Sequence, residues 1–139
     1  MKYIYPAVLS LDMTDEAFPN GVYLISFPDL PNCYTSGETL EEAYEMAEDV
    51  LNLALCGMER DKEEIPAPSS VKVVQDNNIG DVVTIIKADT AEYRKKNDNK
   101  IVRKNLSIPR WLDTLALENN VNFSSVLQRA LMQELHVNP

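Results

Sequence analysis

The segment Lys100-Ile-Val-Arg-Lys-Asn-Leu-Ser-Ile-Pro-Arg-Trp-Leu112 switches from the alternation of a β-strand to the periodicity of a helix. In the alternation of a strand, Leu106 and Ile108 would point to one face of residues 103–108, and Arg103, Asn105 and Ser107 to the other. Pro109 ends this strand and suits the start of a helix. Apolar residues then recur at helical spacing in two runs, separated by the turn-prone residues 119–122. The sequence therefore predicts one strand followed by two helices.

This strand-helix-helix segment is too small to fold alone. At about 35 residues it cannot bury enough apolar surface, and its single strand has no partner for its backbone hydrogen bonds. Both requirements are met if two chains pair these strands antiparallel about a two-fold axis, so we expect a homodimer or a higher homo-oligomer. The apolar residues expected in the dimer core are Leu106, Ile108, Trp111, Leu112, Val126 and Leu127.

A two-stranded ribbon with polar side chains on its open face fits the major groove of DNA. Arg103, Asn105 and Ser107 share that face, and arginine can bond guanine while asparagine can bond adenine. Alternatively, they are exposed polar residues of an ordinary edge strand. The start of the second helix offers backbone N–H groups to a phosphate, or is simply capped. The candidate phosphate contacts are Ser124, Ser125, Lys104 and Arg110.

The charge of the chain is divided unevenly. Residues 1–92 contain five Lys or Arg against 18 Asp or Glu, a net charge of −13, whereas residues 93–139 contain eight against four, a net charge of +4. The basic part is compatible with nucleic acid and the acidic part with a basic protein, although acidic helices are also common as solvated surfaces. Lys100 and the cluster Arg94–Lys96 either add to the attraction for DNA or belong to a solvated linker.

The first half of the chain reads as several strands and one long helix. Strands are expected at Tyr3–Leu11, Val22–Phe27 and Cys33–Ser36. Pro6 places the first of them at a sheet edge or at a bulge. Thr39 and Glu42 have the spacing of a capping box, and an apolar stripe of helical period follows as far as Met58.

Two more strands are expected after this helix, at Val71–Gln75 and Val82–Lys87. Residues 90–99 read as a linker, either irregular or with a helical turn. The helix would cover one face of a mainly antiparallel sheet, which is an α+β arrangement. The expected organisation is a first domain over residues 1–92, a linker over 93–100 and a second domain over 101–139.

The composition, with 45% hydrophobic and 25% charged residues, is typical of a folded soluble protein. No apolar run is long enough to cross a membrane, and the first residues lack the features of a signal peptide. Cys33 and Cys56 lack metal-ligand spacing and are expected to be reduced thiols. We therefore expect a cytoplasmic protein without a metal or a cofactor.

Two stretches resemble known families. Phe27-Pro-Asp-Leu-Pro-Asn-Cys-Tyr-Thr-Ser-Gly-Glu-Thr-Leu-Glu-Glu-Ala-Tyr-Glu-Met-Ala47 is similar to the signature of HicB antitoxins, with Asn32 where that family usually has glycine. The loop Ile65–Ser70 resembles the loop after the helix in the same family. Residues 104–131 look like a ribbon-helix-helix repressor domain, although Lys104 takes an inward strand position that is usually apolar. Together the two resemblances cover most of the chain.

The resemblance implies a non-enzymatic antitoxin of a type II toxin–antitoxin system. Its N-terminal domain, a partial ribonuclease H-like fold with the element order βββαβ(β), would bind and neutralise a small basic HicA-like mRNA interferase. Its C-terminal ribbon-helix-helix domain would bind the double-stranded DNA of the operon promoter as a dimer and repress transcription. On exposure and charge, the toxin-facing residues are expected to be Asp29, Tyr34, Glu38, Glu41 and Glu45.

Two other functions are compatible with the sequence. A ribonuclease H-like fold raises the question of a metal-dependent nuclease, which needs several carboxylates that converge on two ions. The candidates Asp12, Asp15, Glu16 and Asp29 lie in loops, where solvation is their simpler role. A DNA-binding regulator whose N-terminal domain senses a small ligand is the other alternative.

Overall fold

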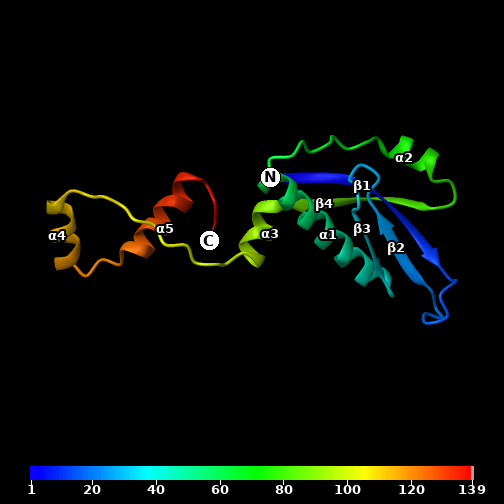
Figure 1. Ribbon diagram of the computed structural model, residues 1–139, viewed down its shortest axis with the longest axis horizontal. Coiled ribbons are helices and arrows are strands. Elements are labelled where there is room, and N and C mark those ends of the chain that lie inside the picture. Colours follow the sequence, from blue (N-terminus) through cyan, green and yellow to red (C-terminus); the bar gives the residue numbers. More distant parts are fainter. Residues whose placement is uncertain (139) are drawn as a thin grey trace. The chain divides into compact units, whose positions relative to one another are not determined.

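The computed structural model describes residues 1–138. The chain divides into two compact units, and the boundary in the sequence lies between Lys100 and Ile101. In chain order, the first unit contains β1 (Lys2–Asp12), β2 (Val22–Ser26), β3 (Tyr34–Gly37), α1 (Leu40–Arg60), α2 (Val71–Asn77), β4 (Val82–Asp89) and α3 (Thr90–Asn97) (Figure 1). The second contains α4 (Arg110–Glu118) and α5 (Phe123–Glu134). The predicted α+β class is confirmed. Within residues 1–138, no helix has both the length and the apolar character needed to cross a membrane.

The four strands form one antiparallel sheet in the order β3-β2-β1-β4. Alternate residues of a strand point to the same face. The pairing of Tyr5 with Ile86 and of Leu9 with Ile25 therefore aligns their side chains on one face, which α1 covers. The buried core is formed by Tyr5, Ala7, Ile25, Phe27, Leu30, Cys33, Ala43, Ala47, Leu51, Leu55, Ile86 and Ala88.

Helix α1 forms where the apolar stripe predicted it. The Thr39 hydroxyl accepts a hydrogen bond of 3.1 Å from the backbone N–H of Glu42, which caps the free N-terminus of the helix. Four residues at a spacing of four, and hence on one side of the helix, are completely buried against the sheet: Ala43, Ala47, Leu51 and Leu55.

The loop before β3 explains a departure from the family signature. The N–H of Phe27 bonds the carbonyl of Cys33 at 3.0 Å, which closes the loop between them. Within it, Asn32 has a φ of 56°, in the left-handed region that favours glycine. Asparagine tolerates this region better than most residues because its short amide can bond the local backbone. The asparagine therefore fits a position where glycine is usual.

Pro6 was predicted to mark an edge strand or a bulge, and the first of these alternatives is wrong for β1 as a whole. Strand β1 lies inside the sheet, with β2 on one side and β4 on the other. Pro6 pairs with Ile85 of β4, but the pairing with β2 begins only at Val8. At the proline, β1 is therefore paired on one side only, and a residue without an N–H is tolerated there.

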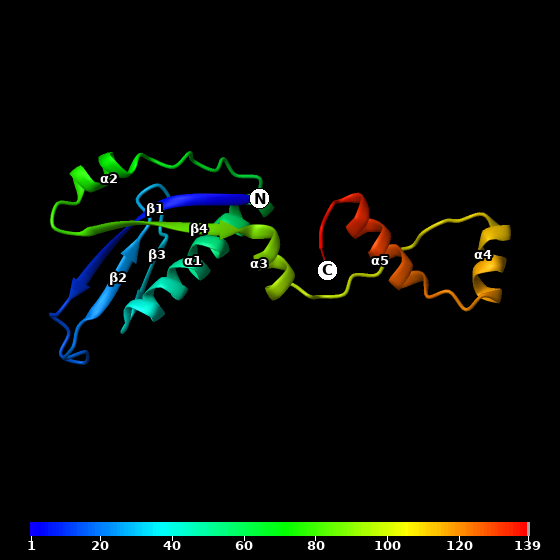
Figure 2. The ribbon, with the colours of Figure 1, turned by 180° about the vertical axis from the view of Figure 1, so that it is seen from behind.

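The segment Val71–Gln75, predicted as a strand, is helix α2. The Ser70 hydroxyl accepts from the N–H of Val73 at 3.3 Å and caps this helix. Val74 is 3% exposed, and Val8, which points away from the α1 side, is 7% exposed. In Figures 1 and 2, α1 and α2 lie on opposite sides of the β1–β4 pair. The capping serine and burial outweigh the strand preference of the three valines.

The segment expected as a linker, residues 93–100, is partly helical, because Thr90–Asn97 form helix α3. The Asp89 side chain caps it by accepting from the N–H of Glu92 at 3.2 Å. Thr90 is completely buried, so the helix starts inside the first unit. Of the expected linker, only Asp98 and the residues after it lack regular structure.

In the second unit, the predicted helices are confirmed, whereas residues 101–109 form no strand. A strand is defined by its hydrogen-bonded partner, and a single chain supplies none here. Asn122 caps α5 by accepting from the N–H of Ser125 at 3.1 Å. Neither α4 nor α5 has a buried residue. This unit therefore has no core of its own in one copy of the chain.

Replacing Gly37 with alanine is expected to lower the free energy of unfolding by roughly 1–3 kcal/mol. A Cβ atom on this residue would lie 2.5 Å from the backbone nitrogen of Ala43 and 2.7 Å from its Cα, so β3 and the start of α1 would have to separate. Urea unfolding followed by circular dichroism measures the change.

The matched control is Gly57→Ala, within α1 itself. A Cβ atom there would meet nothing closer than the Arg60 guanidinium at 4.0 Å. Alanine is favoured over glycine inside a helix, so we expect an unchanged or slightly increased stability. Equal losses in the two variants would contradict a specific close approach at Gly37.

Candidate functional site

Helix α1 presents an acidic surface on the side that faces away from the sheet. From its first residue to Glu59 it contains no lysine or arginine. Its carboxylates, all exposed except the half-buried Glu48, follow one another at helical spacing. Large apolar side chains lie beside them: Leu40 is 57% and Tyr44 is 47% exposed. The acidic surface of α1 consists of Glu41, Glu42, Glu45, Glu48 and Asp49. Carboxylates with exposed apolar neighbours form a surface suited to a basic protein.

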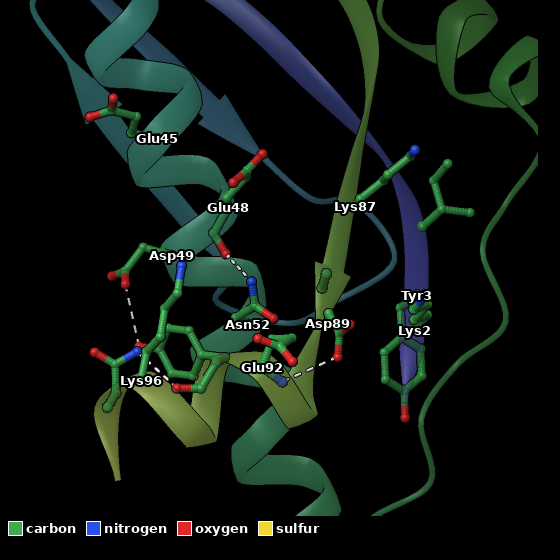
Figure 3. A pocket seen from close by; sticks show the side chains of 14 residues that line it. Lys2, Tyr3, Glu45, Glu48, Asp49, Asn52, Lys87, Asp89, Glu92 and Lys96 are labelled. Atoms are coloured by element: carbon green, nitrogen blue, oxygen red, sulfur yellow. Dashed lines mark hydrogen bonds between the residues drawn. The ribbon is translucent and has the colours of Figure 1, made fainter. Parts of the chain in front are cut away.

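An open groove of about 770 Å³ begins at this surface (Figure 3). Its walls come from α1 and α3, and the ends of β1 and β4 complete it. Five carboxylates and three lysines line it, so the groove is acidic on balance. Its lining residues are Lys2, Tyr3, Ile4, Glu45, Glu48, Asp49, Asn52, Lys87, Ala88, Asp89, Glu92, Tyr93, Lys96 and Asn97.

One buried side-chain polar atom among the described lining residues of the groove has no hydrogen-bond partner. The Asn52 amide nitrogen donates to the carbonyl of Glu48 at 2.9 Å, but its buried Oδ1 atom accepts no hydrogen bond in the structure. Unsatisfied buried acceptors are uncommon because each costs free energy. The Asn52 amide is therefore the lining group that would gain most from a donor.

A hydrogen-bonded cluster around Glu59 joins α1 to α3. The Glu59 carboxylate accepts from Tyr3 at 3.2 Å and from Thr90 at 3.3 Å, and it pairs with Arg94 at 3.2 Å. Burial alone would raise the pKa of Glu59, but the Thr90 hydrogen bond, the Arg94 charge and the Tyr3 hydrogen bond together lower it. The carboxylate is therefore ionised at neutral pH, and its bonds weaken as the pH falls through the lowered pKa.

The structure does not bring the five predicted toxin-facing residues together in the groove. Only Glu45 lines it. Glu41 lies one turn earlier on α1, and Glu38 precedes that helix. Tyr34 is 69% exposed on β3. Asp29 is already bonded, since its carboxylate accepts from the backbone N–H of Ser69 at 2.9 Å and from the Ser69 hydroxyl.

The wall formed by α3 was not predicted from the sequence. Glu92, Tyr93, Lys96 and Asn97 were read as part of a polar linker, yet all four line the groove. A signal was present, because Asp89 and Glu92 have the spacing of a helix cap. The spacing alone does not show which surface the helix packs against.

Two of the carboxylates considered for a nuclease, Asp12 and Asp15, are engaged in local turns. Asp12 accepts from the N–H and the hydroxyl of Thr14 at 2.8 and 2.6 Å, and Asp15 accepts from the N–H of Ala17 at 2.9 Å. Among residues 1–138, no three or more His, Cys, Asp or Glu side chains are grouped so that they could hold a metal ion. Both cysteines are free thiols, and burial raises the pKa of Cys33 to about 11.

The residues predicted to contact DNA are all exposed in the second unit. Arg103, Asn105 and Ser107 alternate along the segment before α4, with Lys104 between the first two. Arg110 begins α4, and Ser124 and Ser125 lie in the first turn of α5.

The residues predicted for a dimer core are open to solvent or half-buried. Leu106 and Trp111 are each 66% exposed, which is unusual for such large apolar side chains. Ile108, Leu112 and Val126 are exposed as well, while Leu127 is half-buried. The two helices thus present an apolar surface that remains uncovered within one copy.

Comparisons with known proteins identify a family and relatives of this chain. Residues 5–131 match the family model described as the HicB-like antitoxin of bacterial toxin–antitoxin systems. Antitoxin HicB 1 of Photorhabdus laumondii is 46% identical over 59 residues, which are 42% of this chain. That alignment spans only 38% of the length of the relative.

Two solved structures resemble the whole chain. A toxin–antitoxin complex from Streptococcus pneumoniae contains a chain that is 25% identical, with a TM-score of 0.59; the alignment covers 96% of this chain and 99% of that one. The antitoxin HicB of Burkholderia pseudomallei is 23% identical, with a TM-score of 0.52 and coverage of 96% and 98%. The second likeness is one of fold alone.

Proposed function

The chain belongs to the HicB-like antitoxin family, and on this basis we propose that it binds and neutralises a small basic toxin and represses its own operon. The observation that carries the proposal is the family match over residues 5–131, which spans nearly all of both units. The likeness to a chain of a solved toxin–antitoxin complex over 96% of this chain supports it.

We place the toxin on the acidic surface of α1 and in the groove that continues from it. A HicA-like mRNA interferase binds RNA and must carry positive charge for that purpose, which complements the carboxylates of α1. The exposed Leu40 and Tyr44 would add apolar contact area at the same surface. Covering the toxin's cationic surface would exclude RNA, so neutralisation needs no catalysis by this chain.

We assign promoter binding to the second unit. Two copies would pair their 103–108 segments into a ribbon, which covers the exposed apolar side chains of α4 and α5. Arg103 and Asn105 would then read bases, and the start of α5 at Ser124 would meet a phosphate. The ribonuclease H-like relationship of the first unit remains part of this proposal.

Co-expression with the protein encoded by the neighbouring reading frame tests the whole proposal. The complex is isolated and its size is measured with and without promoter DNA. We expect a stable complex that protects cells from the partner and binds the promoter as a dimer or a higher oligomer. A partner that is neither bound nor neutralised would contradict the antitoxin function.

Reversing the charge of Glu41 and Glu45 to lysine is expected to weaken toxin binding roughly tenfold or more, because like charges would then face each other. Titration calorimetry at two salt concentrations measures the loss, which should be larger at low salt. The matched control reverses Glu63 and Glu64, which are exposed in the loop after α1 and carry the same total charge. Equal losses in both variants would exclude a specific role for α1.

A further inference from the structure

Helix α3 is held in place by polar contacts with α1. It has only eight residues, a length at which an isolated helix is marginal in water. The Tyr93 hydroxyl donates to Asp49 at 3.3 Å, and the Arg94 guanidinium pairs with Glu59 at 3.2 Å and reaches the carbonyl of Cys56 at 3.5 Å. The only residue of α3 that is buried is Thr90, at its first position. The helix is therefore stable only while it is docked on α1.

The same helix forms one wall of the groove. Lys96 of α3 lines it together with Glu48 and Asp49 of α1 (Figure 3). Tyr93 of α3 also belongs to the lining. A molecule that fills the groove touches both walls, but only when α3 is docked. A ligand that binds one of two states more tightly shifts the population toward that state. Occupancy of the groove and docking of α3 are thus linked.

We propose that α3 is a latch: a toxin bound in the groove holds α3 against α1, and undocking of α3 weakens toxin binding by the same factor. This inference rests on the proposed antitoxin function. The reciprocity is required by thermodynamic linkage. The latch requires no contact between the toxin and the DNA-binding segment.

The latch would act on the second unit through the length of the linker. When α3 is docked, the free segment starts at Asp98 and leads directly to the predicted base-reading residues that begin at Arg103. Undocking adds the eight residues of α3 to this segment. The effective concentration of one tethered domain near another depends on the length of the linker. Toxin binding would therefore change the effective concentration of the first unit near the DNA-binding unit.

Arg94→Ala tests the latch, because Arg94 ties α3 to α1 but does not line the groove. We expect toxin affinity to fall roughly fivefold or more, the usual lower range of coupling between sites. The matched control is Arg60→Ala, which removes the same charge from the end of α1, where Arg60 pairs with the neighbouring Asp61. The control should retain the wild-type affinity. Equal affinities of the wild-type protein and the Arg94 variant would overturn the proposal.

Amide hydrogen exchange gives a second measurement on the intact chain. The ligand is the co-expressed partner from the neighbouring reading frame. In the wild-type protein, we expect the amides of residues 90–97 to exchange more slowly when the partner is bound, and in the Arg94 variant to exchange faster without it. If the partner binds and this exchange is unchanged, the latch is wrong and the antitoxin function stands. If the partner does not bind the wild-type protein, the proposed function itself fails.

Discussion

Replacing Arg103 and Asn105 together with alanine is expected to weaken binding to the operon promoter roughly 100-fold or more. Each residue can make a bidentate contact with one base, worth about 1–3 kcal/mol of discrimination, and a dimer would present each contact twice. Both side chains are exposed and lie two residues apart, so they would share one face if the segment were extended as a ribbon in the major groove requires. Fluorescence anisotropy with labelled promoter DNA and with a scrambled duplex measures the change.

Lys100→Ala provides the contrast within the same segment. A lysine that contacts only phosphate contributes to all sequences alike, so this variant should weaken binding to both duplexes equally and reduce the salt dependence. The double variant should lose mainly the preference for the promoter. If it keeps that preference at full strength, the assignment of the ribbon to residues 103–108 is wrong.

Replacing Leu112 with aspartate is expected to convert the proposed dimer into monomers, with a loss of association of roughly 100-fold or more. Leu112 is 41% exposed in the single chain, and the proposed pairing would bury it. A carboxylate buried there without a partner would cost several kcal/mol per copy. Analytical ultracentrifugation measures the mass, and promoter binding should disappear along with the dimer because each half-site needs its own copy.

Thr114→Asp is the matched control, since it adds the same charge to the same helix. Thr114 is exposed, and its hydroxyl bonds the carbonyl of Arg110 at 3.0 Å. In the sequence it stands between Leu112 and Leu115, but it does not belong to the apolar side of α4. The added carboxylate should therefore remain in water and leave the proposed dimer intact. A dimer that survives Leu112→Asp would show that the apolar surface of α4 and α5 is covered in another way.

Several features of the first unit could be predicted because their signals are local. Thr39 and the buried alanines and leucines of α1 identify that helix by spacing alone, and the structure confirms both its cap and its buried side. The α2 segment shows the limit of such reasoning. Its valines favour a strand, yet a capping serine at Ser70 and the burial of Val74 make it a helix. Tertiary burial outweighs intrinsic preference in such short segments.

The candidate site was less predictable than the fold. Glu45 was found from charge and exposure, and it lines the groove. The opposite wall was missed, because Tyr93 and Lys96 belong to a segment whose polar composition is that of a linker. What holds α3 in place is a set of hydrogen bonds and ion pairs with Asp49 and Glu59, far away in the sequence. No sequence pattern within α3 indicates that these residues are its partners.

The sequence by itself determined the α+β class, the long acidic helix and the incomplete nature of the C-terminal segment, because hydrophobic period, capping residues and segment length are local quantities. The tertiary structure alone decided which strands are neighbours, with β1 inside the sheet despite Pro6, and which walls enclose the groove. Those features depend on contacts between residues distant in the chain. Their free energy comes from burial and pairing that exist only once the chain has folded.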